Sequence, residues 1–240
     1  MRMRIHGFAG VLLAGALLAP GPAAAGRGLR PGLELGVRSA SASHPEGLTS
    51  FDSRWTTGVA AGFTLRAALP AKLALESGLR YVREADRVHD DVDLAFGGGA
   101  STGWWEGTTT FQRLALPLRV SAGLPFGRGF SLEAGVEPQY LLRADQSTDS
   151  MLLFATSAGV RGPAAPAAII FESLMGDHEV TSTLPRWSAV VSAGVGWEPL
   201  TTQPAVVLHA RWLQGVSDQT LSPYMKRYSR AAELGLGLRW

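Results

Sequence analysis

One combination of a serine, a histidine and a carboxylate in this chain could carry out nucleophilic catalysis. Ser192 and His209 lie in successive segments of alternating apolar and polar residues, and Glu198 or Glu233 can supply an orienting acid. In a hydrolytic or acyl-transfer site the histidine takes the serine proton and the acid orients the histidine ring. A polar interior contains such residues by chance, however, and a triad is recognised by its geometry alone. We therefore expect no catalytic residues and no enzyme activity.

Two short acidic segments are candidates for metal binding. The HDDVD segment offers carboxylate oxygens to a divalent cation, but it lacks the glycine and the glutamate that an EF-hand loop requires at its sixth and twelfth positions. The DHE segment has a single histidine, and adjacent side chains diverge, which is typical of a turn. We expect a solvated loop and a turn, with no metal and no cofactor. The residues concerned are His89, Asp90, Asp91 and Asp93, and Asp177, His178 and Glu179.

An aromatic pair, Trp104 and Trp105, lies in the segment STGWWEGTTT. Indole rings in an exposed loop can contact a sugar or a protein partner. Tryptophan is also enriched where a membrane meets water. We expect these two residues to lie in a loop or at the membrane surface.

The first 25 residues have the composition of a secretory signal peptide, with two early arginines, an apolar segment over residues 8–19 and small residues ending at Ala25. We expect residues 1–25 to be the signal and residues 26–240 to form the outer-membrane barrel domain. The apolar segment is shorter than the roughly 20 residues of a spanning helix. The chain has no cysteine, which excludes a cysteine-linked lipid anchor and any disulfide.

Beyond the signal, apolar and polar residues alternate in eight segments, which indicates β-strands with one apolar face. No stretch there has 18 consecutive apolar residues, so membrane-spanning helices are not expected. A form embedded in a membrane must then be a closed barrel. The eight segments are 31–41, 57–69, 72–82, 112–126, 130–143, 186–198, 205–214 and 233–240.

The connections between these segments alternate between short and long. Tight turns join the second segment to the third, the fourth to the fifth and the sixth to the seventh. Short turns on one side, long loops on the other and an even strand number are the layout of a bacterial outer-membrane barrel. The long connections are residues 40–56, 84–109, 144–185 and 215–227. The apolar 144–185 connection can extend its flanking strands, form a short helix or add a hairpin that makes ten strands.

Aromatic spacing supports a membrane placement. Trp187 and Trp197 face outward ten residues apart, as do Phe130 and Tyr140. With a rise of about 3.3 Å per residue and a tilt of about 40°, this spacing spans about 25 Å along the membrane normal, the height of the apolar band. A soluble lipocalin-like barrel should be apolar inside instead. The expected fold class is all-β: an eight-stranded antiparallel transmembrane β-barrel with short periplasmic turns and long extracellular loops.

The other face of each segment carries charge and is expected to point into the barrel. Side chains just fill an eight-stranded barrel, and an unpaired charge there is costly, so we expect arginine–glutamate pairs in place of a channel. A charge-selective pore would need a wider lumen. Inward glycines leave room for the arginine side chains. The inward charges are Glu34, Glu76, Glu133, Glu137, Glu198 and Glu233, with Arg38, Arg66, Arg80, Arg119, Arg143, Arg211 and Arg239.

Two short motifs stand out among the strands. The first is Leu-x-x-Gly-Leu-x-Tyr at residues 75–81, and the second is Leu-x-Leu-Pro-Leu at residues 114–118. Their order, with a Gly-rich strand before the first, resembles the PorT-like outer-membrane β-barrel family. The resemblance implies an integral outer-membrane protein, in a family with one branch linked to protein secretion and gliding. It implies no catalytic residues.

The last segment, ELGLGLRW, ends on an aromatic residue. Leu234, Leu236, Leu238 and Trp240 form one lipid-facing row. This strand must pair with the first strand, because an open edge cannot exist in lipid. A C-terminal strand that ends in an aromatic resembles the signal read by barrel-insertion machinery.

These features predict an integral protein of the bacterial outer membrane. A net charge of +2 with dispersed arginines argues against nucleic acid as a partner. The expected partners are outer-membrane lipids, the barrel-insertion machinery and an envelope protein. The predicted role is structural or binding, through extracellular loops or within an envelope or secretion assembly. The alternatives are a small porin-like channel and a lipid A-modifying barrel enzyme.

Overall fold

The computed structural model describes residues 28–43, 52–96, 99–125, 129–156, 167–169, 176–199, 204–218 and 227–240. At residues 43, 52, 90–96, 99–105, 149–156, 167–169 and 176 it describes the backbone alone. The signal peptide predicted for residues 1–25 lies outside the described residues. No helix within the described ranges is long and apolar enough to cross a membrane.

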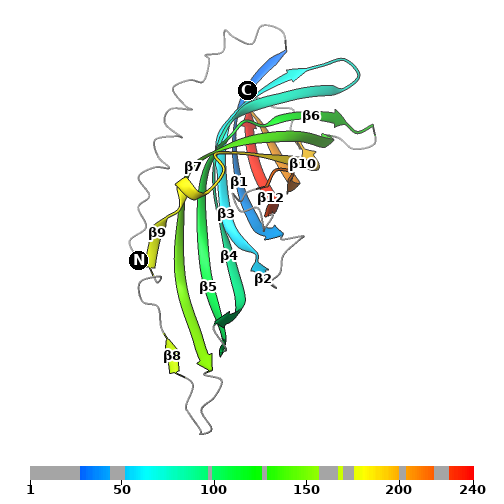
Figure 1. The fold of residues 1–240 in the computed structure, drawn as a ribbon. Coiled ribbons are helices and arrows are strands. Elements are labelled where there is room, and N and C mark those ends of the chain that lie inside the picture. Colours follow the sequence, from blue (N-terminus) through cyan, green and yellow to red (C-terminus); the bar gives the residue numbers. More distant parts are fainter. Residues whose placement is uncertain are drawn as a thin grey trace.

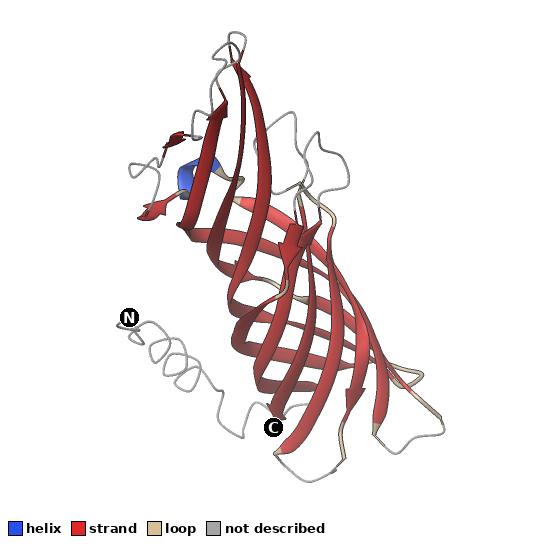
Figure 2. Cartoon of the chain, turned by 90° about the horizontal axis from the view of Figure 1, so that it is seen from below, coloured by secondary structure: helices blue, strands red, loops and turns tan. Residues whose placement is uncertain are grey.

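The described chain forms an antiparallel barrel whose wall has eight positions (Figures 1 and 2). Seven positions are single strands, and β5 and β6 share the eighth, between β4 and β7. The wall strands are β1 (Leu29–Ser43), β3 (Thr56–Ala68), β4 (Leu73–Phe96), β5 (Gly99–Ala115), β6 (Leu118–Gly123), β7 (Phe130–Thr156), β10 (Trp187–Trp197), β11 (Ala205–Gly215) and β12 (Tyr228–Arg239). The short elements are β2 (Asp52–Arg54), which pairs with β4, β8 (Ala167–Ile169) and β9 (Gly176–Glu179), which pair with β7, and the 3-10 helix η3 (Thr181–Thr183).

The barrel closes between its first and last strands. β12 pairs with β1 in antiparallel register, from Arg239 opposite Gly32 to Tyr228 opposite Ser43. The Trp240 N–H continues this pairing by donating to the carbonyl of the residue before Gly32, at 3.0 Å. β10 pairs with β7 along its whole length, so the described wall strands form a complete ring. The predicted pairing of the first and last strands is confirmed, as is the eight-stranded wall.

Pro117 divides one wall strand in two. It lies between the end of β5 and the start of β6, and its nitrogen has no hydrogen to donate to the ladder. The Leu116 N–H donates to the Pro138 carbonyl at 2.9 Å, which holds the junction against β7. Both halves also pair with β4, so the break does not open the wall.

The long loop predicted over residues 84–109 is wrong. β4 continues to Phe96, β5 begins at Gly99, and the two strands pair as far as these residues. The HDDVD segment at residues 89–93 and the tryptophans at 104–105 therefore lie in paired strands, not in a loop. The side chains of most of these residues lie outside the description, so the expected absence of a metal there stays a prediction.

The apolar connection at residues 144–185 extends a wall strand. β7 continues to Thr156, and β8 and β9 pair along its edge outside the ring. The barrel therefore keeps eight wall positions, and the ten-stranded alternative is wrong for the described residues. The Asp177–Glu179 segment, expected to be a turn, is part of β9 and is exposed.

A β-bulge in β7 reverses the facing of one predicted inward arginine. Gln112 of β5 pairs with Arg143, whereas the next β5 residue pairs with Leu141. Leu142 is therefore an extra residue in β7. Because side chains alternate along a strand, an extra residue moves the following side chains to the opposite face. Leu141 is buried, whereas the Arg143 side chain is 55% exposed, so the inward placement predicted for Arg143 is wrong.

The outer face of the wall is apolar between two rows of aromatic residues. Tyr140 and Trp187 are register partners with ring centroids 5.0 Å apart, and Phe130 and Trp197 are partners 5.6 Å apart. Each of these two strands thus has one aromatic near each end of the apolar band, as predicted. Trp240, at the end of the chain, is exposed as well. The exposed apolar residues between the rows include Leu35, Val37, Leu79, Leu132, Val136, Val191, Val195, Leu208, Leu234 and Leu236.

Depth in the membrane should decide the effect of an outward-facing charge. Leu234 lies midway along β12 between Tyr228 and Trp240 and is 68% exposed. We expect Leu234→Arg to lower the free energy of unfolding by about 2–4 kcal/mol, because the cation meets the hydrocarbon centre. Val216→Arg, just past the long-loop end of β11, is the matched control and should cost at most about 1 kcal/mol. Urea titration of the protein folded into vesicles measures both, and equal costs would contradict the membrane placement.

Candidate functional site: the charged core and the rim of the barrel

Arginine–glutamate pairs fill the centre of the barrel. Arg80, which has no exposed surface, donates to Glu137 at 3.1 Å and to Glu233 at 2.8 Å. It also lies 3.2 Å from Glu34. Arg38 donates to Glu233 at 2.5 Å and to Glu137 at 3.0 Å. These five residues come from β1, β4, β7 and β12, so their contacts cross the barrel and connect strands that are not neighbours in the wall.

Arg119 and Arg211 extend this network. Arg119, at the start of β6, donates to Glu34 and to Glu76 at 3.1 Å each. Arg211, in β11, donates to Glu34 at 2.5 Å and to Glu133 at 2.9 Å. All five side chains are buried. Glu34 therefore bridges arginines from two different strands.

The network continues to the short-turn end of the barrel. Arg239, near the end of β12, donates to Glu76 at 2.7 Å and lies 3.6 Å from Glu198. Glu198 and Arg66 are half-buried. Every charge predicted to face inward is thus placed on the inner side of the wall, except Arg143.

Mutual pairing explains how this much charge is tolerated inside the wall. A carboxylate or guanidinium removed from water is costly unless opposite charge and hydrogen bonds replace the water. Glu137 accepts hydrogen bonds from Arg38, Arg80 and Arg119, and Glu233 from Arg38, Arg80 and Arg211. Such charge-assisted bonds are the strongest hydrogen bonds in proteins. The predicted pairing is confirmed for the buried inward arginines and glutamates, whose side chains occupy the described part of the lumen.

Glycines opposite the arginines make this packing possible. Gly62 is the register partner of Arg80, Gly135 of Arg119 and Gly194 of Arg211. A Cβ added at any of these three glycines would meet the Cγ of the opposite arginine at 2.6–2.8 Å and the neighbouring carbonyl oxygen at closer range. The glycines therefore leave the space over which the arginine side chains lie, as the sequence predicts.

His209 lies inside this network and is not hydrogen-bonded to the candidate nucleophile. Its Nε2 atom is 3.3 Å from Glu233 and 3.4 Å from Glu34, and its ring covers Gly235. Ser192 is not its register partner, and no hydrogen bond joins the two residues in the described structure. The activated serine that an acyl-transfer site needs is therefore not formed by these residues.

Three of the core residues also have the spacing of a metal site. The ligand atoms of Glu34, His209 and Glu233 lie within 4.8 Å of one another. Arg211 and Arg80 already donate to these two carboxylates, at 2.5 Å and 2.8 Å respectively. A divalent cation would have to displace guanidinium groups from carboxylates that they neutralise. The arrangement fits ion pairing better than metal binding.

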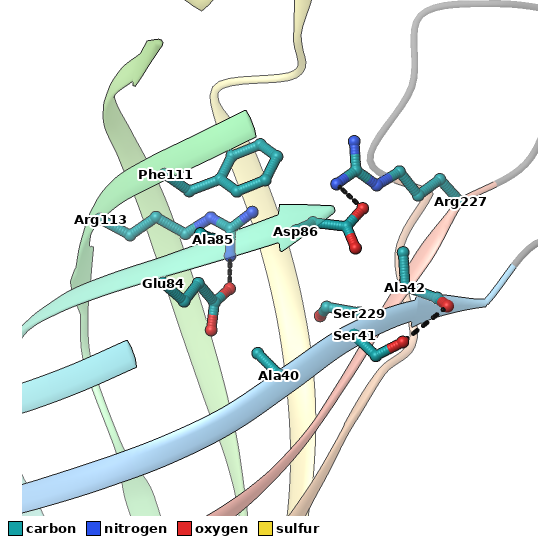
Figure 3. A pocket seen from close by; sticks show the side chains of 10 residues that line it. All are labelled: Ala40, Ser41, Ala42, Glu84, Ala85, Asp86, Phe111, Arg113, Arg227 and Ser229. Carbon is teal, nitrogen blue, oxygen red and sulfur yellow. Dashed lines mark hydrogen bonds and ion pairs between the residues drawn. The ribbon is translucent and has the colours of Figure 1, made fainter. Parts of the chain in front are cut away.

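A second layer of charge lies at the long-loop end of the barrel (Figure 3). Arg113 donates to Glu84, and Arg227 donates to Asp86. Their guanidinium carbons lie 4.5 Å and 4.9 Å from the centroid of the Phe111 ring. With Ala40, Ser41, Ala42, Ala85 and Ser229, these residues line a small cavity between β1, β4, β5 and β12.

Sequence reasoning missed this second layer because residues from Glu84 onward were assigned to a loop. The sequence nevertheless contains a pattern that indicates these inward residues. Glu84 and Asp86 continue the even-numbered inward series of Glu76 and Arg80 along the same strand. Both are buried, which shows that the alternation of β4 continues past the predicted strand end.

Comparisons with known proteins give weak likenesses. No family model and no curated protein matches the sequence. The attachment invasion locus protein Ail of Yersinia pestis, solved with the heparin analogue sucrose octasulfate, is 8% identical, with a TM-score of 0.38 over 89% of this chain and 99% of that one. Neisserial surface protein A is 12% identical, with a TM-score of 0.40 over 88% and 97% of the two chains. OprG of Pseudomonas aeruginosa is 10% identical, with a TM-score of 0.40 over 89% and 96%.

The class of the protein follows from the geometry of its own strands. A closed antiparallel wall of eight positions, an apolar outer face between aromatic rows and a polar interior define a transmembrane β-barrel of the bacterial outer-membrane type. The chain is accordingly an integral outer-membrane β-barrel protein. Because no family model matches, its resemblance to the PorT-like family stays a prediction.

The core network should make single charge removals costly. Arg80→Met leaves Glu34, Glu137 and Glu233 without a shared cation, and we expect the free energy of unfolding to fall by about 3–5 kcal/mol. The matched control is Arg143→Met, which removes an exposed arginine whose guanidinium pairs with Asp145 at 2.8 Å and should have little effect. Denaturant titration followed by tryptophan fluorescence measures both variants. A similar, small effect for both would show that the core pairs are not the main support of the barrel.

Proposed function

We propose that this protein is a non-enzymatic binding or scaffold barrel that presents a β-sheet beyond the membrane to a protein of the envelope. The observation that carries the proposal is the unequal length of the strands. β4 and β7 have 24 and 27 residues, whereas β10 and β11 have 11 each. The extra length of β4, β5 and β7 forms a three-stranded sheet that continues past the rim at the long-loop side (Figures 1 and 2).

Within the described residues, one edge of this projecting sheet is covered in part and the other is free near its end. β8 and β9 pair with β7 on one side. On the other side, β4 pairs with β3 as far as Arg83 and with β2 as far as His89. From Asp90 to Phe96, no strand in the described parts of the chain pairs with the outer edge of β4. An open edge presents unpaired backbone N–H and C=O groups, which a partner segment in extended conformation can complete.

The filled core supports a binding role over a channel. A pore needs a lumen wide enough for hydrated ions, and eight strands leave an interior that side chains fill. Here Arg38, Arg80 and Glu137 are each at most 1% exposed in the described barrel. The position of His209 does not favour a lipid-modifying role, because its ring is buried inside the barrel beside the carboxylates of Glu34 and Glu233.

A role in an envelope or secretion assembly, as in the PorT-like family, would follow from the same surface. The motif residues Leu75 and Leu79 face outward on β4 and are exposed. Gly78 packs against the backbone of Phe63 and Thr64 in β3, with no space for a side chain. These positions support a common way of building the β3–β4 hairpin, and the projecting sheet is the part that a partner can reach.

Shortening the sheet should separate partner binding from barrel assembly. We expect replacement of residues 88–107 by an Asn-Gly turn to leave folding intact, because the core pairs lie below the cut. Heat-modifiable gel mobility checks that the shortened protein is folded. Photo-crosslinking in native cells then uses a probe at residue 92 of the full-length protein. A control probe at residue 55 is placed in both the full-length and the shortened protein. The adduct from residue 92 should disappear on competition with purified projecting-sheet peptide, and residue 55 should give none. A folded protein with no adduct from the free edge would contradict the proposal.

Conductance distinguishes the binding role from the porin alternative. The intact protein in planar bilayers should show no steady ion current, because Arg38, Arg80, Arg119 and Arg211 and their acids occupy the lumen. An open channel at all voltages, with a selectivity that changes on Arg119→Gln, would favour the porin role instead. A generic barrel-forming protein of known conductance, inserted under the same conditions, serves as the positive control.

A further inference from the structure

Arginines form a belt on the outer surface at the long-loop end of the barrel. The aromatic row at this end includes Tyr140 and Trp187. Arg186 directly precedes Trp187, and Arg143 follows Tyr140 by three residues in β7. Gln112 of β5 is the register partner of Arg83 in β4 and of Arg143 in β7, so these two arginines lie on either side of the same β5 position. The belt consists of Arg54, Arg83, Arg87, Arg143, Arg186 and Arg230.

These side chains face away from the core. The side chains of Arg54 and Arg143 are 56% and 55% exposed, and that of Arg87 is 43% exposed. Arg83 and Arg186 are exposed too. The guanidinium of Arg230 lies 5.5 Å from the ring centroid of Trp55, which is itself an exposed aromatic of this end. The belt therefore lies at the level where the apolar band ends.

The acids nearby neutralise only part of the belt. Glu106 pairs with Arg87 at 2.8 Å and with Arg54 at 3.7 Å, and Asp145 pairs with Arg143. The other three arginines, at positions 83, 186 and 230, form no ion pair within the described part of the chain. An outward-facing guanidinium at this level, without an acid, is placed to meet charge supplied by the membrane.

The opposite end of the barrel is different. Its aromatic row includes Phe130, Trp197 and Trp240. The described basic residues near this row lie on the inward series of the strands, in the core or in a turn. Arg30 and Arg66 are register partners on the inward series, and Arg239 is buried in the core. Lys72 lies in the turn between β3 and β4. Among the described residues, the outward-facing arginines of the wall thus lie at the long-loop end.

We propose that the belt binds the phosphate groups of a phosphorylated glycolipid, of the lipid A type, in the leaflet at the long-loop side. The belt offers guanidinium groups, and the planar guanidinium binds phosphate through two parallel hydrogen bonds. The apolar face below the belt contacts the acyl chains, so one lipid can satisfy both surfaces. The inference depends on the membrane placement and is independent of the proposed protein partner.

Retention of lipid by the purified full-length protein tests this inference. Native mass spectrometry from detergent micelles compares bisphosphorylated lipid A with the same lipid after removal of both phosphates. We expect the protein to retain the bisphosphorylated form at least tenfold more strongly. Arg83→Gln with Arg186→Gln should lose most of this preference, by roughly tenfold or more, as expected for two surface cations near anionic lipid. The matched control, Arg30→Gln with Lys72→Gln at the other end, should retain the lipid as the unchanged protein does.

The outcomes that would overturn the inference are specific. Equal retention of the two lipid forms by the unchanged protein excludes phosphate recognition, and this comparison needs no variant to fold. Displacement of lipid A by an equimolar amount of phosphatidylglycerol would show a general attraction to anionic lipid and would also overturn it. Heat-modifiable gel mobility confirms that each variant is folded, so an unchanged preference in a folded Arg83→Gln, Arg186→Gln protein would exclude these two arginines as the binding groups.

Discussion

The pairing of buried arginines with buried glutamates is the interaction on which the rest of this structure depends. The wall must turn its apolar face to lipid, so its polar face is enclosed in a space too narrow for much water. Each charge in that space needs an opposite charge at hydrogen-bond distance. Arg80 and Glu137 meet this need through several partners from different strands. The same contacts connect opposite sides of the wall. The arginines and glutamates therefore stabilise the barrel while they neutralise one another's charge.

For the binding role proposed above, a neutralised core directs attention to the surface of the protein. Inside the barrel, His209 lies within 3.4 Å of the carboxylates of Glu34 and Glu233 and forms no hydrogen bond with Ser192 in the described structure. What the wall leaves available is the projecting part of β4, β5 and β7 and the outward arginines around the long-loop end. The first offers backbone hydrogen bonds at a sheet edge, and the second offers positive charge at the membrane surface. Both are consequences of strands that continue beyond the apolar band.

Most of the wall could be predicted from the sequence, and the failures have identifiable physical causes. Strict alternation gave the facing of residues such as Glu34, Arg38 and Leu234 correctly, because one closed surface divides lipid from core. It failed at Arg143, where the extra residue Leu142 shifts the pairing of β7 with β5. It also failed to find the buried Glu84, since a strand that leaves the membrane loses the strong apolar face that marks it in the sequence.

By itself, the sequence determined the class of fold, the eight wall positions, the lipid-facing side and the closing of the last strand on the first. These properties follow from a local period of two and from the rule that no strand edge stays open in lipid. Only the tertiary structure decided which arginine pairs with which glutamate, where the bulge turns a side chain outward and how far the strands project. Those features depend on the register between strands distant in the chain, such as β1, β4 and β12, and a pattern within one strand carries no information about register.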